Sequence, residues 1–388
     1  MPNYSGVWTL QEQYEAILEG NWTGISTPIL FSWGESERGE TGQNVNLSAD
    51  ISSPTQVGTE SGWEFVAKGN SQSHAAAIRD GALYMWGLGT NGSLGQNDTI
   101  SRSSPVQVGA LTNWASVTVG DQLQTLAIKT DGTLWGWGSN NNGLLGLNEP
   151  VTANKSSPVQ VGSDTNWSQV SSQQFSMIAL KTDGTMWTCG NGSYGEVGDN
   201  VRVDRSSPVQ VGASETWAFV ESGSFNAFAI TTSGELYSWG ASGAGRLGHN
   251  TNTYRSSPTQ VGALTNWSTV NSAACTLAIK TDGTLWGWGN NSSGEIGDNT
   301  AITKSSPVQI GAETNWIQVN SAHSQSFGID SDQKLYSWGY GRFGATGQNT
   351  SGVILSSPTQ VGALTGWTSV GGGQYFGLAI FNARTGMS

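Results

Sequence analysis

Residues of the kinds that most often perform catalysis or bind metals are scarce in this sequence. The histidines are His74, His249 and His323, and no cysteine or carboxylate stands at metal-ligand spacing from any of them. We interpret these histidines as side chains that satisfy turns. Cys189 and Cys275 lie far apart in strand-like runs, which favours reduced core thiols over a disulfide. Since the sequence also lacks a P-loop, a Gly-x-Ser-x-Gly motif, a His-Glu-x-x-His motif and a dinucleotide fingerprint, we expect no catalytic residue, no metal and no cofactor.

A second set of chemically active side chains is cationic, and each member directly precedes a Ser-Ser-Pro tripeptide. The residues are Arg102, Lys155, Arg205, Arg255 and Lys304. In a symmetric arrangement these charges lie at the same height and form a ring, which suits recognition of an acidic glycan or an acidic protein. The alternative is that each cation pairs with a nearby carboxylate such as Asp204, and such pairing neutralises the ring.

The tripeptide belongs to a repeat that runs through most of the chain. Ser-Ser-Pro ends at prolines spaced 49 to 53 residues apart: Pro54, Pro105, Pro158, Pro208, Pro258, Pro307 and Pro358. Each copy also contains Trp-x-x-Val, an aromatic-x-Trp-Gly motif in which Cys189 once replaces the tryptophan, and Gly-x-x-Gly-x-Asn. Short alternating runs bounded by Gly, Pro and Asn at this period indicate small sheets repeated around an axis or along a solenoid.

Each repeat is predicted to contain four short strands. In one copy these are residues 105–108, 114–119, 125–129 and 133–137. The last two strands are joined by Thr-Asp-Gly, a turn whose aspartate bonds its own backbone, and we expect this role for Asp131, Asp183 and Asp282. Trp135 and Trp137 project from one face of their strand, and only a neighbouring sheet can bury that face. The strand that begins with Trp-x-x-Val is rich in small residues, so we place it nearest the axis.

The two ends of the chain favour a closed ring over a solenoid. Residues 29–33 begin in the middle of a repeat, and the last copy stops after a strand at 377–381. Each end therefore supplies two strands of one sheet. Joining them completes the seventh sheet and leaves no open edge.

The combined pattern resembles the regulator of chromosome condensation (RCC1) repeat. The resemblance rests on Trp-x-x-Val-x-x-Gly, Ala-Ile-Lys-Thr-Asp-Gly-Thr-Leu-Trp-x-Trp-Gly, Gly-x-x-Gly-x-Asn and Ser-Pro-x-Gln-Val-Gly, over about residues 29–381. It implies an all-β fold, a seven-bladed β-propeller of four-stranded blades closed by N- and C-terminal strands that share one blade. The family name also implies guanine-nucleotide exchange. Two features count against that activity: the repeat loops are short and nearly uniform, and the N-terminal region is acidic.

Residues 1–28 do not fit the repeat. Thr9 to Glu12 has the form of a capping box, and apolar residues follow at helical spacing, which predicts one short amphipathic helix. With the flanking tryptophans this helix forms a candidate docking segment: Trp8, Leu10, Tyr14, Ile17, Leu18 and Trp22. The segment either packs on the propeller or docks on another protein. The phrase GVWTLQEQYEAILEGNW is similar to leader segments of tailed-phage structural proteins. We expect a propeller over residues 29–381 and a short tail at 382–388.

Charge and hydropathy limit the classes of partner. The chain has 16 Lys plus Arg against 28 Asp plus Glu, a net charge of -12, so it offers no attraction to a nucleic-acid backbone. No window reaches the roughly 18 apolar residues that cross a membrane, and the first residues lack the form of a signal peptide. We therefore expect neither nucleic acid nor membrane insertion.

The function expected from these observations is a non-catalytic virion structural or attachment protein, such as a tail fibre, an appendage or a capsid-associated protein. Its expected location is the virion, with the cytoplasm as the alternative. Its expected partners are other virion proteins, bound through residues 1–28, and a host-surface glycan or protein; a homo-oligomer is left open. The alternative function is a bacterial RCC1-like protein-binding or inhibitor module. That role needs exposed aromatic residues on a varied loop face, and the candidates are Tyr194, Tyr254, Tyr340 and Phe343.

Overall fold

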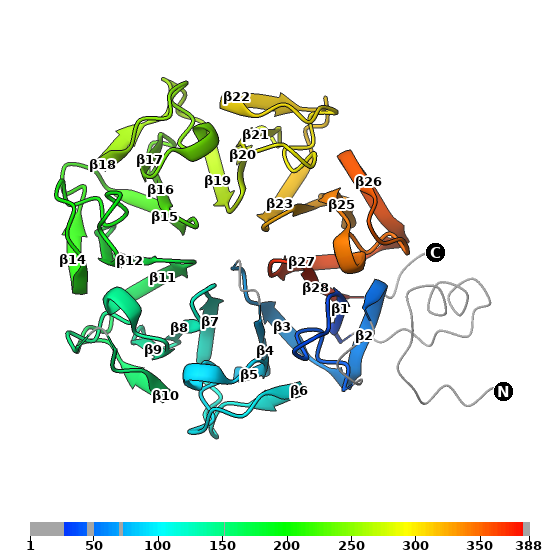
Figure 1. Cartoon of the computed structure of the whole chain (residues 1–388), viewed down its shortest axis with the longest axis horizontal. Coiled ribbons are helices and arrows are strands. Elements are labelled where there is room, and N and C mark those ends of the chain that lie inside the picture. The colour runs from blue at the N-terminus through cyan, green and yellow to red at the C-terminus, as the bar shows by residue number, and fades with distance from the viewer. Residues whose placement is uncertain (1–26, 45–49, 70–72, 151, 383–388) are drawn as a thin grey trace.

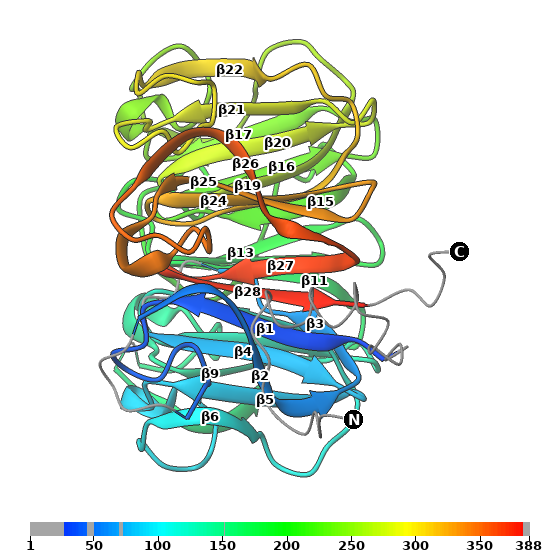
Figure 2. The same cartoon turned by 90° about the vertical axis from the view of Figure 1, so that its right-hand side faces the viewer.

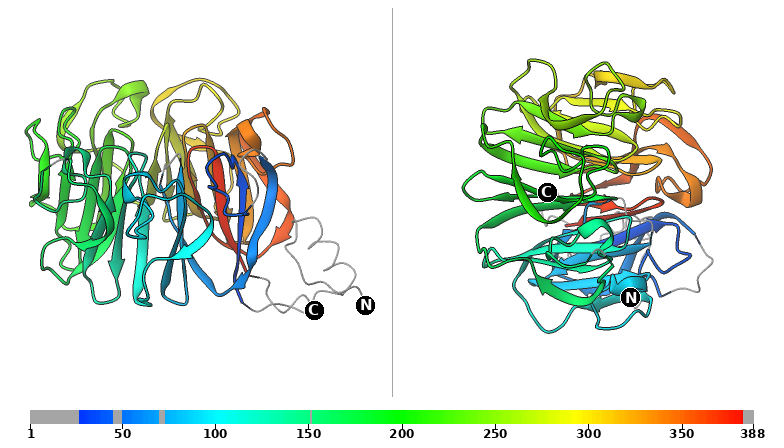
Figure 3. Two further views of the ribbon diagram at one scale, coloured as in Figure 1. Left: turned by 60° about the horizontal axis from the view of Figure 1, so that its bottom comes forward. Right: turned by 60° about the vertical axis from the view of Figure 1, so that its left-hand side comes forward.

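The computed structural model describes residues 27–44, 50–69, 73–150 and 152–382. Their strands form seven antiparallel sheets of four strands each, arranged as blades around a central axis (Figure 1). The oblique views show the blades standing side by side in a ring (Figure 3). The predicted all-β, seven-bladed propeller is confirmed.

The two inner strands of each blade contain most of the small and buried residues. The innermost strand begins at the tryptophan of Trp-x-x-Val: β3 (Trp63–Val66), β7 (Trp114–Val119), β11 (Trp167–Ser172), β15 (Trp217–Ser222), β19 (Trp267–Ser272), β23 (Trp316–Ser321) and β27 (Trp367–Gly372). These strands converge on the axis, as predicted (Figure 1). The second strands are β4 (His74–Arg79), β8 (Gln124–Lys129), β12 (Ser176–Lys181), β16 (Asn226–Thr231), β20 (Cys275–Lys280), β24 (Gln325–Asp330) and β28 (Phe376–Phe381).

The two outer strands contain the aromatic-x-Trp-Gly and Ser-Ser-Pro motifs. The third strands are β5 (Ala82–Gly87), β9 (Leu134–Gly138), β13 (Met186–Gly190), β17 (Leu236–Gly240), β21 (Leu285–Gly289), β25 (Lys334–Tyr340) and β1 (Ile29–Gly34). The outermost strands are β6 (Arg102–Gln107), β10 (Lys155–Gln160), β14 (Arg205–Val211), β18 (Arg255–Gln260), β22 (Lys304–Ile310), β26 (Ile354–Thr365) and β2 (Ile51–Ser61). Short 3-10 turns follow some third strands: η1 (Thr90–Gly92), η2 (Asn141–Gly143), η3 (Gly243–Gly245) and η4 (Arg342–Gly344).

We number the blades in chain order. Blade 1 contains β3–β6, blade 2 β7–β10, blade 3 β11–β14, blade 4 β15–β18, blade 5 β19–β22, blade 6 β23–β26, and blade 7 contains β27, β28, β1 and β2. Both ends of the chain thus contribute two strands to blade 7, as expected. Leu30 of β1 lies opposite Ile380 of β28, and Figure 2 shows these two strands side by side.

The sequence repeat and the blade are out of phase by one strand, which corrects the predicted unit. That unit joined residues 105–108 to the strand at 114–119. In the structure, β6 starts at Arg102 and pairs with β5 of the preceding copy, with Gln107 opposite Tyr84. A repeat period along the chain leaves the boundary of a sheet undefined, because hydrogen-bond pairing between strands defines the sheet.

The Thr-Asp-Gly turns have the predicted geometry. Asp131 Oδ1 accepts a hydrogen bond from the backbone N–H of Thr133 at 3.0 Å and another from its hydroxyl at 2.6 Å. The Thr133 hydroxyl oxygen in turn accepts from the indole N–H of Trp135 at 2.8 Å. Asp183 and Asp282 bond in the same way. These aspartates are therefore turn residues, and they do not form a ring of free carboxylates.

In six of the seven blades a tryptophan of the third strand connects the blade to the one before it. Trp137 is fully buried, and its Nε1 donates to the carbonyl of Ser93 in blade 1 at 3.0 Å. A Cβ on Gly95, whose φ is +67°, would lie 2.8 Å from that nitrogen, so the Gly-x-x-Gly motif permits this close approach. Equivalent bonds are donated by Trp33, Trp86, Trp239, Trp288 and Trp338. In blade 3, Cys189 occupies the equivalent position.

The first serine of each Ser-Ser-Pro tripeptide lies at a second link between blades. The backbone N–H of Asn97 in blade 1 donates to the carbonyl of Ser156 in blade 2 at 2.7 Å. Asn97 has a φ of +62°, a left-handed conformation that asparagine tolerates better than most residues. Equivalent links are donated by Asn44, Asn148, Asn200, Asn250, Asn299 and Asn349.

The predicted N-terminal helix and its candidate docking residues fall outside the described residues. Both stay predictions. The first described strand begins at Ile29 and the last ends at Phe381.

Replacing Trp137 with alanine is expected to reduce the free energy of unfolding by about 3–5 kcal/mol, because it empties a fully buried site between two blades. The matched control is Trp135→Ala, which removes a half-buried ring of the same strand and should cost clearly less. Urea unfolding followed by circular dichroism measures both values. Equal losses in the two variants would contradict the interpretation that Trp137 connects the blades.

Candidate binding face

Two kinds of loop open at the same end of every blade. One joins the first strand to the second, and the other joins the third strand to the fourth. They lie together because the N–H group after the third strand bonds the carbonyl before the second, as from Asn191 to Phe175 and from Ala241 to Phe225, both at 2.8 Å. We call this end of the propeller the loop face. The Thr-Asp-Gly hairpins lie at the opposite end, which we call the hairpin face.

The loop face carries a cluster of aromatic rings across blades 3 and 4, here called the aromatic patch: Phe175, Tyr194, Phe225 and Tyr254. Phe175 and Phe225 lie 4.8 Å apart between ring centroids, and Tyr194 contacts Phe225 edge-on at 5.9 Å. Tyr194 also contacts Tyr254 edge-on at 5.4 Å. The two tyrosines are exposed at 41% and 42%, so the patch faces solvent although its rings hold one another in place.

A second aromatic cluster lies where blades 6 and 7 meet. Tyr375 contacts Phe343 at 5.6 Å and His323 at 6.0 Å between ring centroids, and the guanidinium of Arg342 lies 4.4 Å from the Phe343 centroid. Of the aromatic candidates named from sequence, Tyr194, Tyr254 and Phe343 thus belong to clusters. Tyr340 is half-buried at the end of β25.

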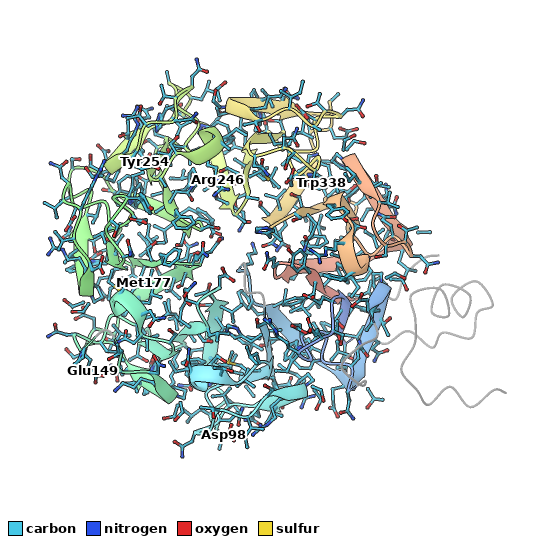
Figure 4. The ribbon with its side chains drawn as sticks, viewed as in Figure 1. Asp98, Glu149, Met177, Arg246, Tyr254 and Trp338 are labelled. Atoms are coloured by element: carbon cyan, nitrogen blue, oxygen red, sulfur yellow. The ribbon has the colours of Figure 1, made fainter. Side chains whose placement is uncertain are left out.

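The predicted cations occupy equivalent places, since each is the first residue of an outermost strand. Four of them form ion pairs with a carboxylate of their own loop: Arg102 with Asp98 at 2.7 Å, Lys155 with Glu149 at 2.5 Å, Arg205 with Asp199 at 2.6 Å and Lys304 with Asp298 at 3.2 Å. Figure 4 shows Asp98 and Glu149 at the outer rim. This geometry favours local pairing over a ring of free charges, and binding of an acidic ligand stays a prediction.

Arg255, the fifth predicted cation, and Asp204, the carboxylate named as a local partner, do not pair in this way. Arg255 lies near His249, where its charge adds to burial in lowering the pKa of that imidazole to about 4. Asp204 accepts instead from the side-chain amide of Asn142 at 2.8 Å and from the backbone N–H of Gly192 at 3.0 Å.

The histidines do not form a site. His74 is fully buried with its Nε2 3.2 Å from the Thr125 hydroxyl, and burial lowers its pKa to about 4. His249 Nε2 lies 3.0 Å from the hydroxyl of Ser238. His323 is exposed on the loop face. The three imidazoles therefore occupy unrelated environments.

Cys189 and Cys275 are free thiols in the core, as predicted, and burial raises the pKa of each to about 12. Within the described part of the chain, no group of three or more His, Cys, Asp or Glu side chains is arranged to hold a metal ion. The same residues include no helix with the length and apolar character needed to cross a bilayer.

Three glutamates of Gly-x-x-Gly motifs are buried beneath the loop face: Glu40, Glu196 and Glu295. Burial raises the pKa of Glu40 and of Glu196 to about 7, and it raises that of Glu295 as well. A backbone N–H donates to each carboxylate at 2.7 to 2.8 Å and limits the rise. These carboxyl groups are structural, since each lies beside the carbonyl that accepts a tryptophan N–H of the next blade.

Near the axis of the propeller, sequence reasoning missed two ionisable side chains, Lys68 and Glu221, that line one cavity. A cavity of about 170 Å³ is lined by Lys68, Thr118, Glu221 and Asn271, among others. The side-chain amide of Asn271 donates to Glu221 at 2.6 Å, and burial raises the pKa of Glu221 to about 8. Burial also lowers the pKa of Lys68.

Sequence reasoning missed further residues of the loop face, namely Phe175, Phe225 and Tyr375. All three directly precede a second strand, where the other copies have Ser73, Leu123, Ala274 and Ser324. Aligning the repeats on that position shows the aromatic residues in three copies. Their contact across blades follows only from the ring.

The fold and the motifs that join its blades define a seven-bladed β-propeller with a variable loop face. The model of the RCC1-like domain matches residues 26–327, which is more than half of the chain. The chain therefore belongs to the RCC1-like domain family.

The relatives are similar over less than half of the chain. It is 31% identical over 173 residues to the human E3 ubiquitin-protein ligase HERC2, a match that covers 44% of this chain and 4% of HERC2. It is 28% identical over 179 residues to the human regulator of chromosome condensation, covering 44% of this chain and 40% of that protein. The chain thus spans well under two thirds of the length of these relatives. Among solved structures, Prp20p of Saccharomyces cerevisiae superposes with a TM-score of 0.80 at 19% identity, covering 93% of both chains.

Stability is expected to increase as the pH falls from 8 to about 6.5, above the range in which the histidines titrate in the unfolded state. The carboxyl groups of Glu40 and Glu196 have a pKa of about 7 in the fold against a usual 4.5, so the native state binds more protons than the unfolded state in this window. The stabilisation is present at the acidic end and is lost as the pH rises to about 7. Melting temperatures measured by circular dichroism should show this trend. Glu196→Gln should raise the melting temperature at pH 8 and flatten the profile, whereas the exposed Glu64→Gln should do neither.

Proposed function

We propose that this chain is a non-catalytic propeller that binds a protein partner through its loop face, with the aromatic patch as the anchor. The observation that supports this is the ring contact between Tyr194 and Tyr254, which holds two exposed tyrosines in place across two blades. Val201 and Val203, exposed at 41% and 55% in the same loop as Tyr194, extend the apolar surface. Pre-positioned tyrosines of this kind are typical anchors of protein interfaces.

Proteins that share the fold support a protein partner in general. Prp20p has binding properties toward Gsp1p and histones, and yeast RCC1 (Prp20) has been solved bound to Kap60. We do not infer the same partners for this chain, because one fold hosts many functions and each depends on the side chains at the binding site.

A photo-crosslinking residue at position 254 should give a discrete crosslinked product in the native host, and Tyr194→Ala in the same chain should abolish that product. The matched control is the same crosslinker at Leu264, which is 47% exposed in a loop on the hairpin face. Gel electrophoresis and mass spectrometry identify the products. A product from position 264 with none from position 254 would place the partner on the other face.

The finer proposal is a virion structural or attachment protein, with residues 1–28 docking on other virion proteins and the propeller presented to a host-surface glycan or protein. Its support is the sequence of residues 1–28, with Trp8 and Trp22 on either side of the expected helix. The alternative, a bacterial protein-binding or inhibitor module, needs the loop face but not that segment.

Mass spectrometry of purified particles should find the chain at a stoichiometric copy number. Deletion of residues 1–28 should remove it from the particles while circular dichroism still shows a folded propeller. Absence of the full-length chain from particles would refute the virion proposal and leave the loop-face proposal intact.

A further inference from the structure

At the hairpin end of four blades, one strand position places a cation beside two aromatic rings. It is the last residue of the second strand, which pairs with the tryptophan that begins the first strand. In blade 2, Lys129 lies opposite Trp114. Its ammonium nitrogen is 4.9 Å from the Trp114 ring centroid and 3.5 Å from that of Trp135. We call the space between these two rings the cation seat.

The same arrangement recurs in three other blades. Lys181 lies 4.7 and 4.2 Å from its two rings in blade 3, and Lys280 lies 4.9 and 3.6 Å from its rings in blade 5. In blade 1 the guanidinium of Arg79 lies 5.4 and 4.6 Å from Trp63 and Tyr84. Distances under about 6 Å to a ring face are those of cation–π contacts. Each cation seat in these four blades therefore contains a cation of the chain itself.

Blade 6 keeps the two rings but replaces the cation with a carboxylate. Asp330 lies opposite Trp316 in the strand pairing, and the rings of Trp316 and Tyr336 are 5.0 Å apart. Asp330 accepts from the backbone N–H of Lys334 at 2.9 Å and from the Tyr336 hydroxyl at 3.1 Å. Burial, followed by the charge of Asp330, raises the pKa of Tyr336 to about 12, so the phenol stays a donor.

Asp330 is only 3% exposed, yet it has no ion pair among the described residues. The ammonium of Lys334 pairs with Asp332 instead, at 3.0 Å. A buried carboxylate without a cationic partner is costly. A cation that entered this seat would therefore gain both the charge of Asp330 and the faces of two rings.

There is room for such a cation. A cavity of about 490 Å³ is lined by Trp316, Asp330 and Tyr336. The carboxylate of Glu313 adds negative charge along it, and the ion pair of Lys334 with Asp332 also lines it. In blade 1 the equivalent groove, of about 540 Å³, is lined by Arg79.

Two other blades lack the cation but do not offer the same site. Blade 4 has Thr231, whose hydroxyl lies 3.2 Å from Glu235, and blade 7 has Phe381, which packs on Trp367 at 5.2 Å between ring centroids. Neither places a buried carboxylate beside the two rings. The site is therefore specific to blade 6.

We propose that the cation seat of blade 6 binds a lysine side chain of a partner protein, with Asp330 as the counter-charge and Trp316 and Tyr336 as the flanking rings. A lysine is the expected occupant because the chain's own lysines fill this seat in three blades. The groove beside the rings leaves room for the aliphatic stem. This proposal does not depend on the partner proposed for the loop face.

The experiment is an NMR titration of the full chain with lysine blocked as its Nα-acetyl N-methylamide, observed at the tryptophan indole N–H signals. The Trp316 signal should shift in a saturable manner at millimolar probe. Acetylation of the probe at Nε should abolish the shift. Asp330→Asn should weaken binding at least tenfold, and Asp330→Lys should abolish it because the new ammonium fills the seat as Lys280 does in blade 5.

The reciprocal variant, Lys280→Asp, should create a second site and a saturable shift at Trp267. If that variant does not fold, Asp330→Lys still decides, since it gives blade 6 the residue that three other blades contain. A Trp316 shift that persists in Asp330→Lys, or that the Nε-acetylated probe produces equally, would overturn the proposal. The loop-face crosslinking experiment can succeed or fail independently of this result.

Discussion

The hydrogen bond from a third-strand tryptophan to a carbonyl of the preceding blade is the interaction on which the rest of the structure depends. A four-stranded sheet cannot bury its own aromatic face, so each blade is stable only against a neighbour. The indole hydrogen bond makes that packing directional. For example, Trp338 of blade 6 donates to the carbonyl of Glu295 in blade 5 at 2.8 Å. Around the ring, the bond from Trp33 to the Ala345 carbonyl connects the N-terminal part of the chain to blade 6. This contact recurs at six junctions between blades, and the backbone link from asparagine to the first serine of Ser-Ser-Pro recurs at all seven.

The positions of the repeat are of two kinds, those that join blades and those that do not. Residues that join blades, such as the Gly-x-x-Gly glycines and the first serine of Ser-Ser-Pro, recur because the close approach of backbones allows few alternatives. Residues beside them differ between copies without disturbing the join. The aromatic patch arises where two copies carry phenylalanine before the second strand, and the cation seat of blade 6 arises where Asp330 replaces lysine. Binding specificity in such a propeller therefore comes from positions at which one copy differs from the others.

Membership of the RCC1-like domain family accounts for the seven-bladed fold. The candidate binding sites depend on side chains particular to this chain. The net charge of -12 and the pairing of most rim cations with carboxylates give a surface without large positive fields. The two surfaces that stand out differ in chemistry. One presents exposed tyrosines at the loop face, and the other presents a buried carboxylate beside two rings.

The sequence by itself determined the number of blades, the innermost strand, the hairpin turns and the sharing of blade 7 by both ends of the chain. It could do so because those features follow from period, alternation and turn chemistry, which are local properties. The phase of the blade relative to the repeat, the pairing of Arg102 with Asp98 and the contact between Phe175 and Phe225 were decided only by the tertiary structure. The phase and the ring contact depend on strand pairing across copies and on ring closure, which bring together residues far apart in the sequence, about 50 positions for Phe175 and Phe225. Arg102 and Asp98 are only four residues apart, but the sequence left local pairing and a ring of free charges both open, and the conformation of the loop decided between them.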